Sequence, residues 1–202
     1  MTKVNDMQFE GAKKYILKKL KYELRPEFTY HCFDHTIDVC NAAKTIGSSE
    51  GISPYDMKLL LTAALFHDSG FTEGGSNDHE EKSCRIVNQN LRGFNYADDE
   101  IEIINGMIMA TKLPQSPKNQ LEEIICDADL DYLGRDDFFA ISNLLFIEFR
   151  TAGVVANEYA WDKIQVVFFE NHHYFTKTSD RLRNKGKLEN LARVKARLKG
   201  AF

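Results

Sequence analysis

Apolar residues recur along this chain every three to four positions, as in amphipathic helices, and no convincing run alternates with the period of a strand. No segment is biased enough in composition to be a linker or a repeat. The pattern therefore predicts a single all-α bundle over residues 1–202. We expect its helices at about 8–24, 33–46, 53–68, 78–91, 98–111, 118–132, 136–150, 157–173 and 179–199.

Local signals place several helix ends. Pro26 ends the first helix, because the residue before a proline disfavours the α conformation. Ser53 can cap the third helix and Pro54 suits its first turn. Asp78 is expected to cap the fourth helix. The last helix is expected to be amphipathic, with a basic outer face and an apolar stripe formed by Leu188, Leu191, Val194 and Leu198.

The third helix carries the most informative feature of the chain. Its body, residues 57–66, is apolar nearly all round after Lys58, which predicts a helix in the middle of the fold. His67 and Asp68 follow directly. A buried carboxylate is costly unless it is paired, and a divalent cation held by histidine and carboxylate is one such pairing. The alternative is a His-Asp pair that caps the helix or faces solvent.

Two further groups of candidate ligands flank this pair in the sequence. His31 and His35, in residues 30–36 (YHCFDHT), are four positions apart and share a helical face if the helix begins that early. Asp127, Asp129 and Asp131, in residues 126–131 (CDADLD), lie beside an apolar stripe and repel one another unless a cation or solvent relieves them. Each group also has an ordinary interpretation, as core or surface histidines and as a solvated acidic helix end.

Taken together and in this order, the residues resemble the HD superfamily of metal-dependent phosphohydrolases. The resemblance implies an all-α fold, with a core motif region at about 30–135 and C-terminal helices at about 136–199 that complete the bundle. It implies that His35, His67, Asp68 and a distal aspartate hold a divalent cation. The family's Ala-Asp-Leu context favours Asp129, and Asp127 is the alternative ligand or an outer acid. The resemblance does not distinguish Mn, Mg, Co, Zn, Ni and Fe.

The YHxxxH segment is also similar to that of cyclic-nucleotide phosphodiesterases, which implies that His31 donates a proton to the leaving oxygen. In this mechanism Asp68 positions the attacking water. The histidine that those enzymes place soon after the His-Asp pair is absent here. The resemblance to these phosphodiesterases therefore implies their catalytic chemistry but not their cyclic-nucleotide substrate.

A second cation is a weaker expectation. His79, with Glu80 as the alternative, stands where some members of the superfamily supply a ligand for a second metal. Thr111 and Lys112 occupy the segment where the fuller two-metal pattern has histidine, which favours one tightly held metal. Lys112 could contact a substrate phosphate, or could be a helix-end lysine in solvent.

Composition limits the partners. The net charge of -4 gives no general reason to expect nucleic acid or an anionic membrane. No apolar run is long enough to span a membrane. The four cysteines form no CxxC pair, which is typical of reduced thiols in a cytoplasmic protein. The resemblance to the HD superfamily implies a small phosphorylated, nucleotide-like substrate instead.

Other features carry less weight. His172 and His173 are adjacent and leave a helix in different directions, so joint chelation is not expected. The glycine-bearing loop at 70–77 lacks the signature of a P-loop and is expected at the rim of the metal site.

The leading function is hydrolysis of a phosphate ester or anhydride. The alternatives are a catalytically silent HD domain that binds a nucleotide or a protein, and a di-iron oxygenase, which needs more ligands than can be assigned.

Overall fold

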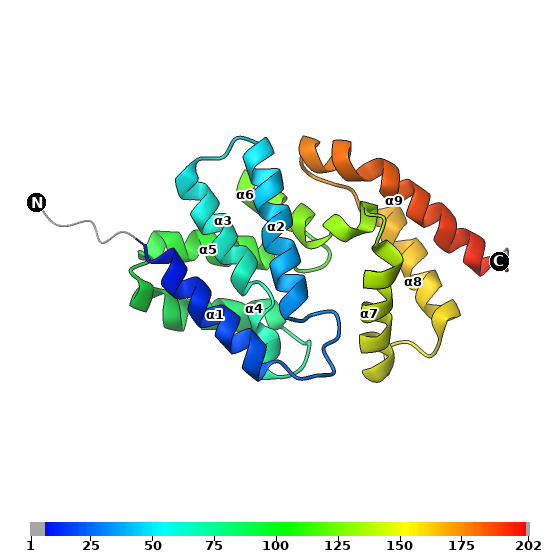
Figure 1. The fold of residues 1–202 in the computed structure, drawn as a ribbon, viewed down its shortest axis with the longest axis horizontal. Helices are drawn as coiled ribbons and strands as arrows, with labels where there is room; N and C mark the ends of the chain where they lie inside the picture. Colours follow the sequence, from blue (N-terminus) through cyan, green and yellow to red (C-terminus); the bar gives the residue numbers. More distant parts are fainter. Residues whose placement is uncertain (1–6, 201–202) are drawn as a thin grey trace, which may run out of the picture. The chain divides into compact units, whose positions relative to one another are not determined.

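Helices form all the regular structure of the part of the chain that the computed structural model describes, residues 7–200 (Figure 1). No strand occurs within that part, so the predicted all-α class is confirmed. The chain packs as two compact units, one from residues 7–25 and 31–129 and the other from residues 26–30 and 130–200.

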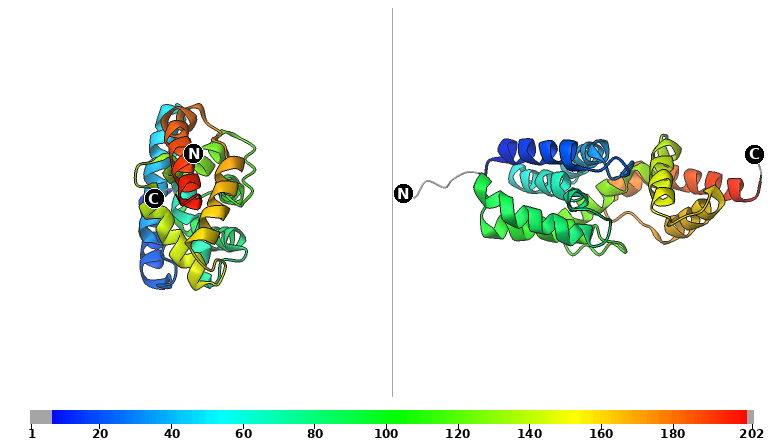
Figure 2. Two further views of the ribbon diagram at one scale, coloured as in Figure 1. Left: turned by 90° about the vertical axis from the view of Figure 1, so that its right-hand side faces the viewer. Right: turned by 90° about the horizontal axis from the view of Figure 1, so that it is seen from below.

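The first unit is built around α3. Its elements are α1 (Phe9–Glu23), α2 (Phe33–Ser49), α3 (Pro54–Phe66), η1 (Ser69–Glu73), α4 (His79–Asn90), η2 (Leu91–Phe94), α5 (Asp98–Ala110) and α6 (Gln120–Asp129). Helices α1 and α2 pack on one side of α3 and α5 on the other, as the second view of Figure 2 shows. From Leu59 to Phe66 only Leu61 is not fully buried, which confirms the central position predicted for this helix.

The predicted caps of two helices have different outcomes. Oγ of Ser53 accepts a hydrogen bond from the backbone N–H of Asp56 at 3.0 Å, so the predicted cap of α3 is confirmed. Asp78 precedes α4, but its side chain makes no capping hydrogen bond, and that prediction was wrong. Its backbone is left-handed (φ 53°), and one carboxylate oxygen lies 3.9 Å from Nζ of Lys112 instead.

The second unit consists of η3 (Asp131–Gly134), α7 (Phe138–Thr151), α8 (Glu158–Asn171) and α9 (Lys177–Leu198). Helix α9 packs against α8 and η3. Its start is capped by Thr176, whose Oγ1 accepts a hydrogen bond from the backbone N–H of Ser179 at 3.1 Å. The core of the unit is largely aromatic and is formed by Tyr30, Leu130, Tyr132, Leu133, Phe138, Phe169 and Val194.

Helix α9 buries most of the face that its leucines predict, with Leu191 packed against the core of the unit. Val194 is buried, but Leu188 is 57% exposed, so the predicted apolar stripe is wrong at that residue. Lys187, expected on the basic outer face, is only 5% exposed. The buried Asn190 donates hydrogen bonds to the carbonyl oxygens of Leu133 and Arg135 at 2.9 and 3.0 Å. Hydrogen bonding to η3 therefore fixes the rotation of the helix together with the apolar packing of Val194.

Two smaller expectations concern thiols and membranes. All four cysteines are free. None of the helices in residues 7–200 combines the length and hydropathy that crossing a bilayer requires.

Candidate metal centre

Three elements of the first unit bring the candidate ligands together. His35 lies in the first turn of α2, His67 follows the last residue of α3, and Asp129 is the last residue of α6. Because α2 packs against both α3 and α6, side chains far apart in the sequence converge at one place.

The ligand atoms of these three residues form a tight group. One ligand atom each of His35, His67 and Asp129 lies within 4.8 Å of the other two. Oδ1 of Asp129 is 3.2 Å from Nε2 of His35 and 3.5 Å from Nε2 of His67, and the two Nε2 atoms are 3.4 Å apart. Both histidines are almost completely buried. The arrangement is a compact set of nitrogen and oxygen donors of the kind that holds a divalent cation.

Asp68 extends the group. Its Oδ2 lies 3.2 Å from Nε2 of His67 and 3.4 Å from Nε2 of His35. Its Oδ1 lies 3.5 Å from Nε2 of His79. Oδ2 is buried and, among the described residues, has no hydrogen-bond partner. A buried carboxylate oxygen that lacks a donor is an observation a cation would explain.

Hydrogen bonds at the far side of two rings fix their tautomers. Nδ1 of His67 is 2.9 Å from the carbonyl oxygen of Ala64, and Nδ1 of His79 is 3.0 Å from that of Ser76. Because a carbonyl oxygen only accepts, each Nδ1 carries the proton. In the neutral rings each Nε2 then presents a lone pair to the carboxylates, which is the tautomer of a metal ligand.

The electrostatics of the group favour positive charge. Burial alone would lower the pKa of His67, but the carboxylates of Asp68 and Asp129 outweigh it and raise that pKa well above its usual range. Burial would raise the pKa of Asp68, yet the charges of neighbouring histidines hold it well below its usual range, and the same balance applies to Asp129. The carboxylates are therefore ionised, and a cation or protons on the rings must balance them.

These residues fit a divalent cation. The donors are imidazole nitrogen and carboxylate oxygen, they converge from separate elements, and Asp68 contributes a buried oxygen with no donor. His35, His67, Asp129 and Asp68 are the residues that would hold it.

The two candidate aspartates of α6 differ in position. Asp129 belongs to the converging group, whereas Asp127 is fully buried and is not one of its members. Asp131 lies in the second unit, where its Oδ1 accepts a hydrogen bond from Nε of Arg183 at 2.7 Å. Of these aspartates, Asp129 is therefore the one that lies with His35 and His67, and its role as a metal ligand stays a prediction.

His31 lies beside this group on an aromatic support. Its ring stacks on Phe71 at 4.3 Å between centroids, with an interplanar angle of 17°. The centroids of the His35 and His79 rings are each 6.1 Å from its own. Phe71 also contacts the ring of His79 at 4.5 Å, so one phenylalanine supports both histidines.

His79 and Lys112 were the more peripheral candidates. Nε2 of His79 lies 3.4 Å from Oε1 of the buried Glu80, in addition to its contact with Asp68. Nζ of Lys112 donates to Oε1 of Glu81 at 2.6 Å. Lys112 is therefore paired with α4, and its expected contact with substrate stays a prediction.

The sequence reasoning missed the residues that shape the loop after α3. Oγ of Ser83 donates to the carbonyl oxygen of His67 at 2.6 Å and accepts from the N–H of Gly70 at 2.8 Å. A Cβ at Gly70 would lie 2.1 Å from the carbonyl oxygen of His79, so only glycine fits there. Phe71 was also missed. Spacing gives no sign of such contacts, although a glycine closely following the His-Asp pair was visible.

Comparison with known proteins identifies the family. The profile of the HD domain family matches residues 32–131, the segment that contains the four converging residues. The chain belongs to the HD superfamily. The match lies within the predicted core motif region at about 30–135. A single HD domain over residues 1–202 stays a prediction.

A relative found by sequence comparison gives no information about activity. An uncharacterized protein of Clostridium beijerinckii is 31% identical over 98 residues, which cover 47% of this chain and 61% of that protein. The similarity thus spans less than two thirds of that relative's length.

Two crystal structures resemble this HD protein in fold. One is described as a predicted HD superfamily hydrolase from an uncultured Thermotogales bacterium, with a TM-score of 0.61, 20% identity and 91% coverage of both chains. The other is a protein from Lactobacillus plantarum, with a TM-score of 0.66, 17% identity and coverage of 96% of this chain and 97% of that one. At these identities the likeness concerns the fold alone.

Proposed function

We propose that this HD protein hydrolyses a phosphate ester or anhydride with the help of a divalent cation. The observation that carries the proposal is the convergence of His35, His67 and Asp129 within 4.8 Å, beside a buried oxygen of Asp68 that lacks a hydrogen-bond donor. Membership of the HD superfamily supports the same chemistry.

In this proposal His35, His67, Asp68 and Asp129 hold the cation. A second, weaker cation site would use the other oxygen of Asp68, which lies 3.5 Å from Nε2 of His79. Two carboxylate oxygens facing two different histidine environments support a bridging role for Asp68. Glu80 is the further donor next to His79.

A bound divalent cation supplies Lewis-acid polarisation of the phosphoryl group and lowers the pKa of a coordinated water. The protein's own side chains orient the water and supply a proton. Asp68 orients the water, and His31 holds the proton that the leaving oxygen needs. The ring contact between His31 and Phe71 supports this role, because a fixed donor beside the group loses little freedom during the reaction.

The substrate belongs to the proposal as well. We place a small phosphorylated, nucleotide-like molecule at this site, with Lys112 as a candidate phosphate contact. We also propose a cytoplasmic location, which the four free cysteines support.

An activity screen tests the proposed hydrolysis. The purified protein is assayed with Mn²⁺, Co²⁺ or Mg²⁺ against p-nitrophenyl phosphate, bis-p-nitrophenyl phosphate and nucleotides. Turnover that depends on added cation and is lost in His35→Ala supports the proposal. His173→Ala is the matched control, because this exposed histidine lies in the second unit, where its ring makes an edge contact with Phe175, and the variant should keep full activity.

Two results would favour the alternatives. Absence of turnover with every cation, together with tight binding of a nucleotide, would favour a catalytically silent HD domain. Bound iron with turnover that consumes O₂ would favour an oxygenase. Turnover that is equal in wild type and His35→Ala would contradict the proposed site.

A further inference from the structure

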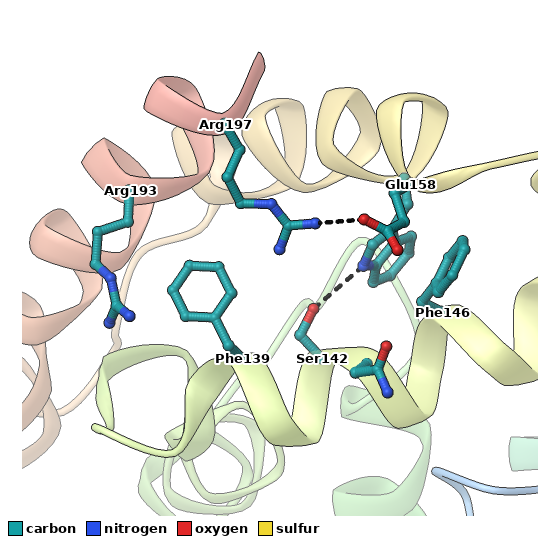
Figure 3. A pocket seen from close by; sticks show the side chains of 8 residues that line it. Phe139, Ser142, Phe146, Glu158, Arg193 and Arg197 are labelled. Carbon is teal, nitrogen blue, oxygen red and sulfur yellow. Dashed lines mark hydrogen bonds and ion pairs between the residues drawn. The ribbon is translucent and has the colours of Figure 1, made fainter. Parts of the chain in front are cut away.

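The second unit contains a pocket of its own, separate from the metal-ligand group. It has a volume of about 600 Å³ and is lined by residues of α7, α8 and α9 (Figure 3). This volume lies within the range of about 300–1,000 Å³ that is typical of small-molecule sites. Three aromatic side chains, Phe139, Phe146 and Trp161, form part of its wall.

A polar network behind the wall fixes the pocket's shape. Nε1 of Trp161 donates to Oγ of Ser142 at 3.2 Å, and that hydroxyl donates to Oε1 of Gln165 at 2.5 Å. Nε2 of Gln165 in turn donates to Oδ1 of Asp162 at 2.9 Å. All four side chains belong to buried residues. The pocket is therefore preorganised by satisfied polar groups and not by apolar packing alone.

The two arginines of the pocket differ in how their charge is balanced. Arg197 forms an ion pair with Glu158 at 3.2 Å (Figure 3) and a second one with Asp162 at 3.1 Å. The guanidinium of Arg193 lies 4.3 Å from the ring centroid of Phe139 and donates to Oδ1 of Asn190 at 3.4 Å. Within residues 7–200 no carboxylate forms an ion pair with Arg193. Arg193 therefore has donors left for an anion.

We propose that this pocket binds a small planar aromatic molecule that carries one anionic group. The anion is bound by Arg193, whose planar array of N–H donors matches a carboxylate or a phosphate. The planar ring lies against the aromatic wall, where stacked and edge contacts are favourable. One unbalanced cation at the wall favours a single negative charge over a neutral or multiply charged ligand.

The chain offers a direct reporter of this site. Trp161 is the only tryptophan among the 202 residues, so the ¹H–¹⁵N spectrum contains one indole N–H resonance, and that N–H lies in the pocket wall. The probe is 2-naphthoate, a planar aromatic monoanion, and the matched neutral probe is 2-naphthamide. Both are titrated into the full chain.

The expected result is a saturable shift of the indole resonance with naphthoate and binding at least about tenfold weaker with naphthamide, the effect of losing a charge-assisted hydrogen bond. Arg193→Gln should weaken naphthoate binding by a similar factor. Lys185→Gln is the matched control, because it removes one positive charge from the same helix at a side chain that is 90% exposed. Its affinity should stay within roughly twofold of wild type, because an exposed distant charge is screened.

Three results would overturn the proposal. The first is no shift up to about 10 mM naphthoate, a concentration that would nearly saturate a site with a dissociation constant of about 1 mM. The second is equal binding of naphthoate and naphthamide. The third is an equal loss in Arg193→Gln and Lys185→Gln, which would indicate non-specific attraction to the basic helix. An unchanged indole resonance in the ligand-free Arg193→Gln variant verifies that the pocket is intact.

Discussion

Oδ2 of Asp68 lies 3.2 Å from Nε2 of His67, its neighbour in the sequence, and has no hydrogen-bond donor among the described residues. The two side chains thus face each other across a short gap at the end of a buried helix, with His35 and Asp129 on the same gap. A carboxylate in this position is strongly destabilising unless positive charge balances it.

The first prediction separates the two aspartates of α6. Asp129→Asn should weaken divalent metal binding by more than about 100-fold, because loss of a ligand exceeds the roughly tenfold to 100-fold effect of outer residues. Asp127→Asn should weaken it by less than about 100-fold, as an outer residue does. Calorimetric titration with Mn²⁺ measures both. A larger loss in Asp127→Asn than in Asp129→Asn would reverse the assignment.

The second prediction concerns the aromatic support of His31. Phe71→Leu should lower kcat severalfold while metal affinity changes little, because the ring of Phe71 stacks on His31 and does not belong to the ligand group. The substitution should also cost about 1–2 kcal/mol of stability.

Phe138→Leu is the control for this stability loss. Phe138 is equally buried, at 1% exposure, and lies in the second unit. Stability should fall by a similar amount in both variants, whereas kcat should fall only in Phe71→Leu. Equal kcat values in the two variants would show that Phe71 has no positioning role.

The third prediction is a helix substitution with an effect opposite to helix propensity. Alanine is favoured over glycine within a helix by about 1 kcal/mol, so Gly186→Ala in α9 would stabilise an isolated helix. In the folded protein the new Cβ would lie 2.2 Å from the carbonyl oxygen of Gly134. We therefore expect a loss of at least about 2 kcal/mol, as for overpacking.

Thermal unfolding followed by far-UV circular dichroism measures this effect. Gly93→Ala is the control, because a Cβ at Gly93 meets no atom within 4 Å. A higher melting temperature for Gly186→Ala would mean that α9 does not approach η3 as closely as described.

The fourth prediction concerns the stability of the second unit at acidic pH. Burial lowers the pKa of His172 from 6.5 to about 3, and the charge of Lys187 adds to this effect. Nζ of Lys187 lies 3.2 Å from Nδ1 of His172. As the pH falls, His172 is therefore protonated in the unfolded state at a higher pH than in the folded state. His172 therefore leaves stability unchanged above about pH 6.5 and lowers it as the pH falls toward 3, by about 3 kcal/mol at pH 4.

His172→Gln should reduce this pH dependence, whereas His173→Gln, at the exposed neighbouring residue, should not. Denaturant unfolding followed by Trp161 fluorescence reports on the same unit. Identical slopes of stability against pH in the two variants would contradict the buried, neutral state of His172.

The sequence predicted those features that depend on local periodicity. The apolar body of α3 predicted that His67 and Asp68 lie in the interior, and both residues are buried. Such patterns survive folding because each helix must bury its own apolar surface.

The remaining features depend on contacts between distant segments. Asp127 and Asp129 lie at similar angular distances from the apolar stripe of α6, on opposite sides of it, so periodicity does not distinguish them. Only the end of α6 at Asp129 and its packing on α2 do so. The face of α9 is set by Asn190 and Gly186 contacting η3, more than fifty positions earlier. Arg193 gives no sequence signal that it lines a pocket, because basic residues occur all along that helix.

Metal content tests the central claim most directly. The wild-type protein, Asp68→Ala and the control Asp34→Ala, at an exposed aspartate beside His35, are incubated with Mn²⁺, desalted and analysed by mass spectrometry. We predict bound metal in the wild type and in Asp34→Ala and its loss in Asp68→Ala, with all three proteins folded. Equal metal content in wild type and Asp68→Ala, or no metal in the wild type, would contradict the account.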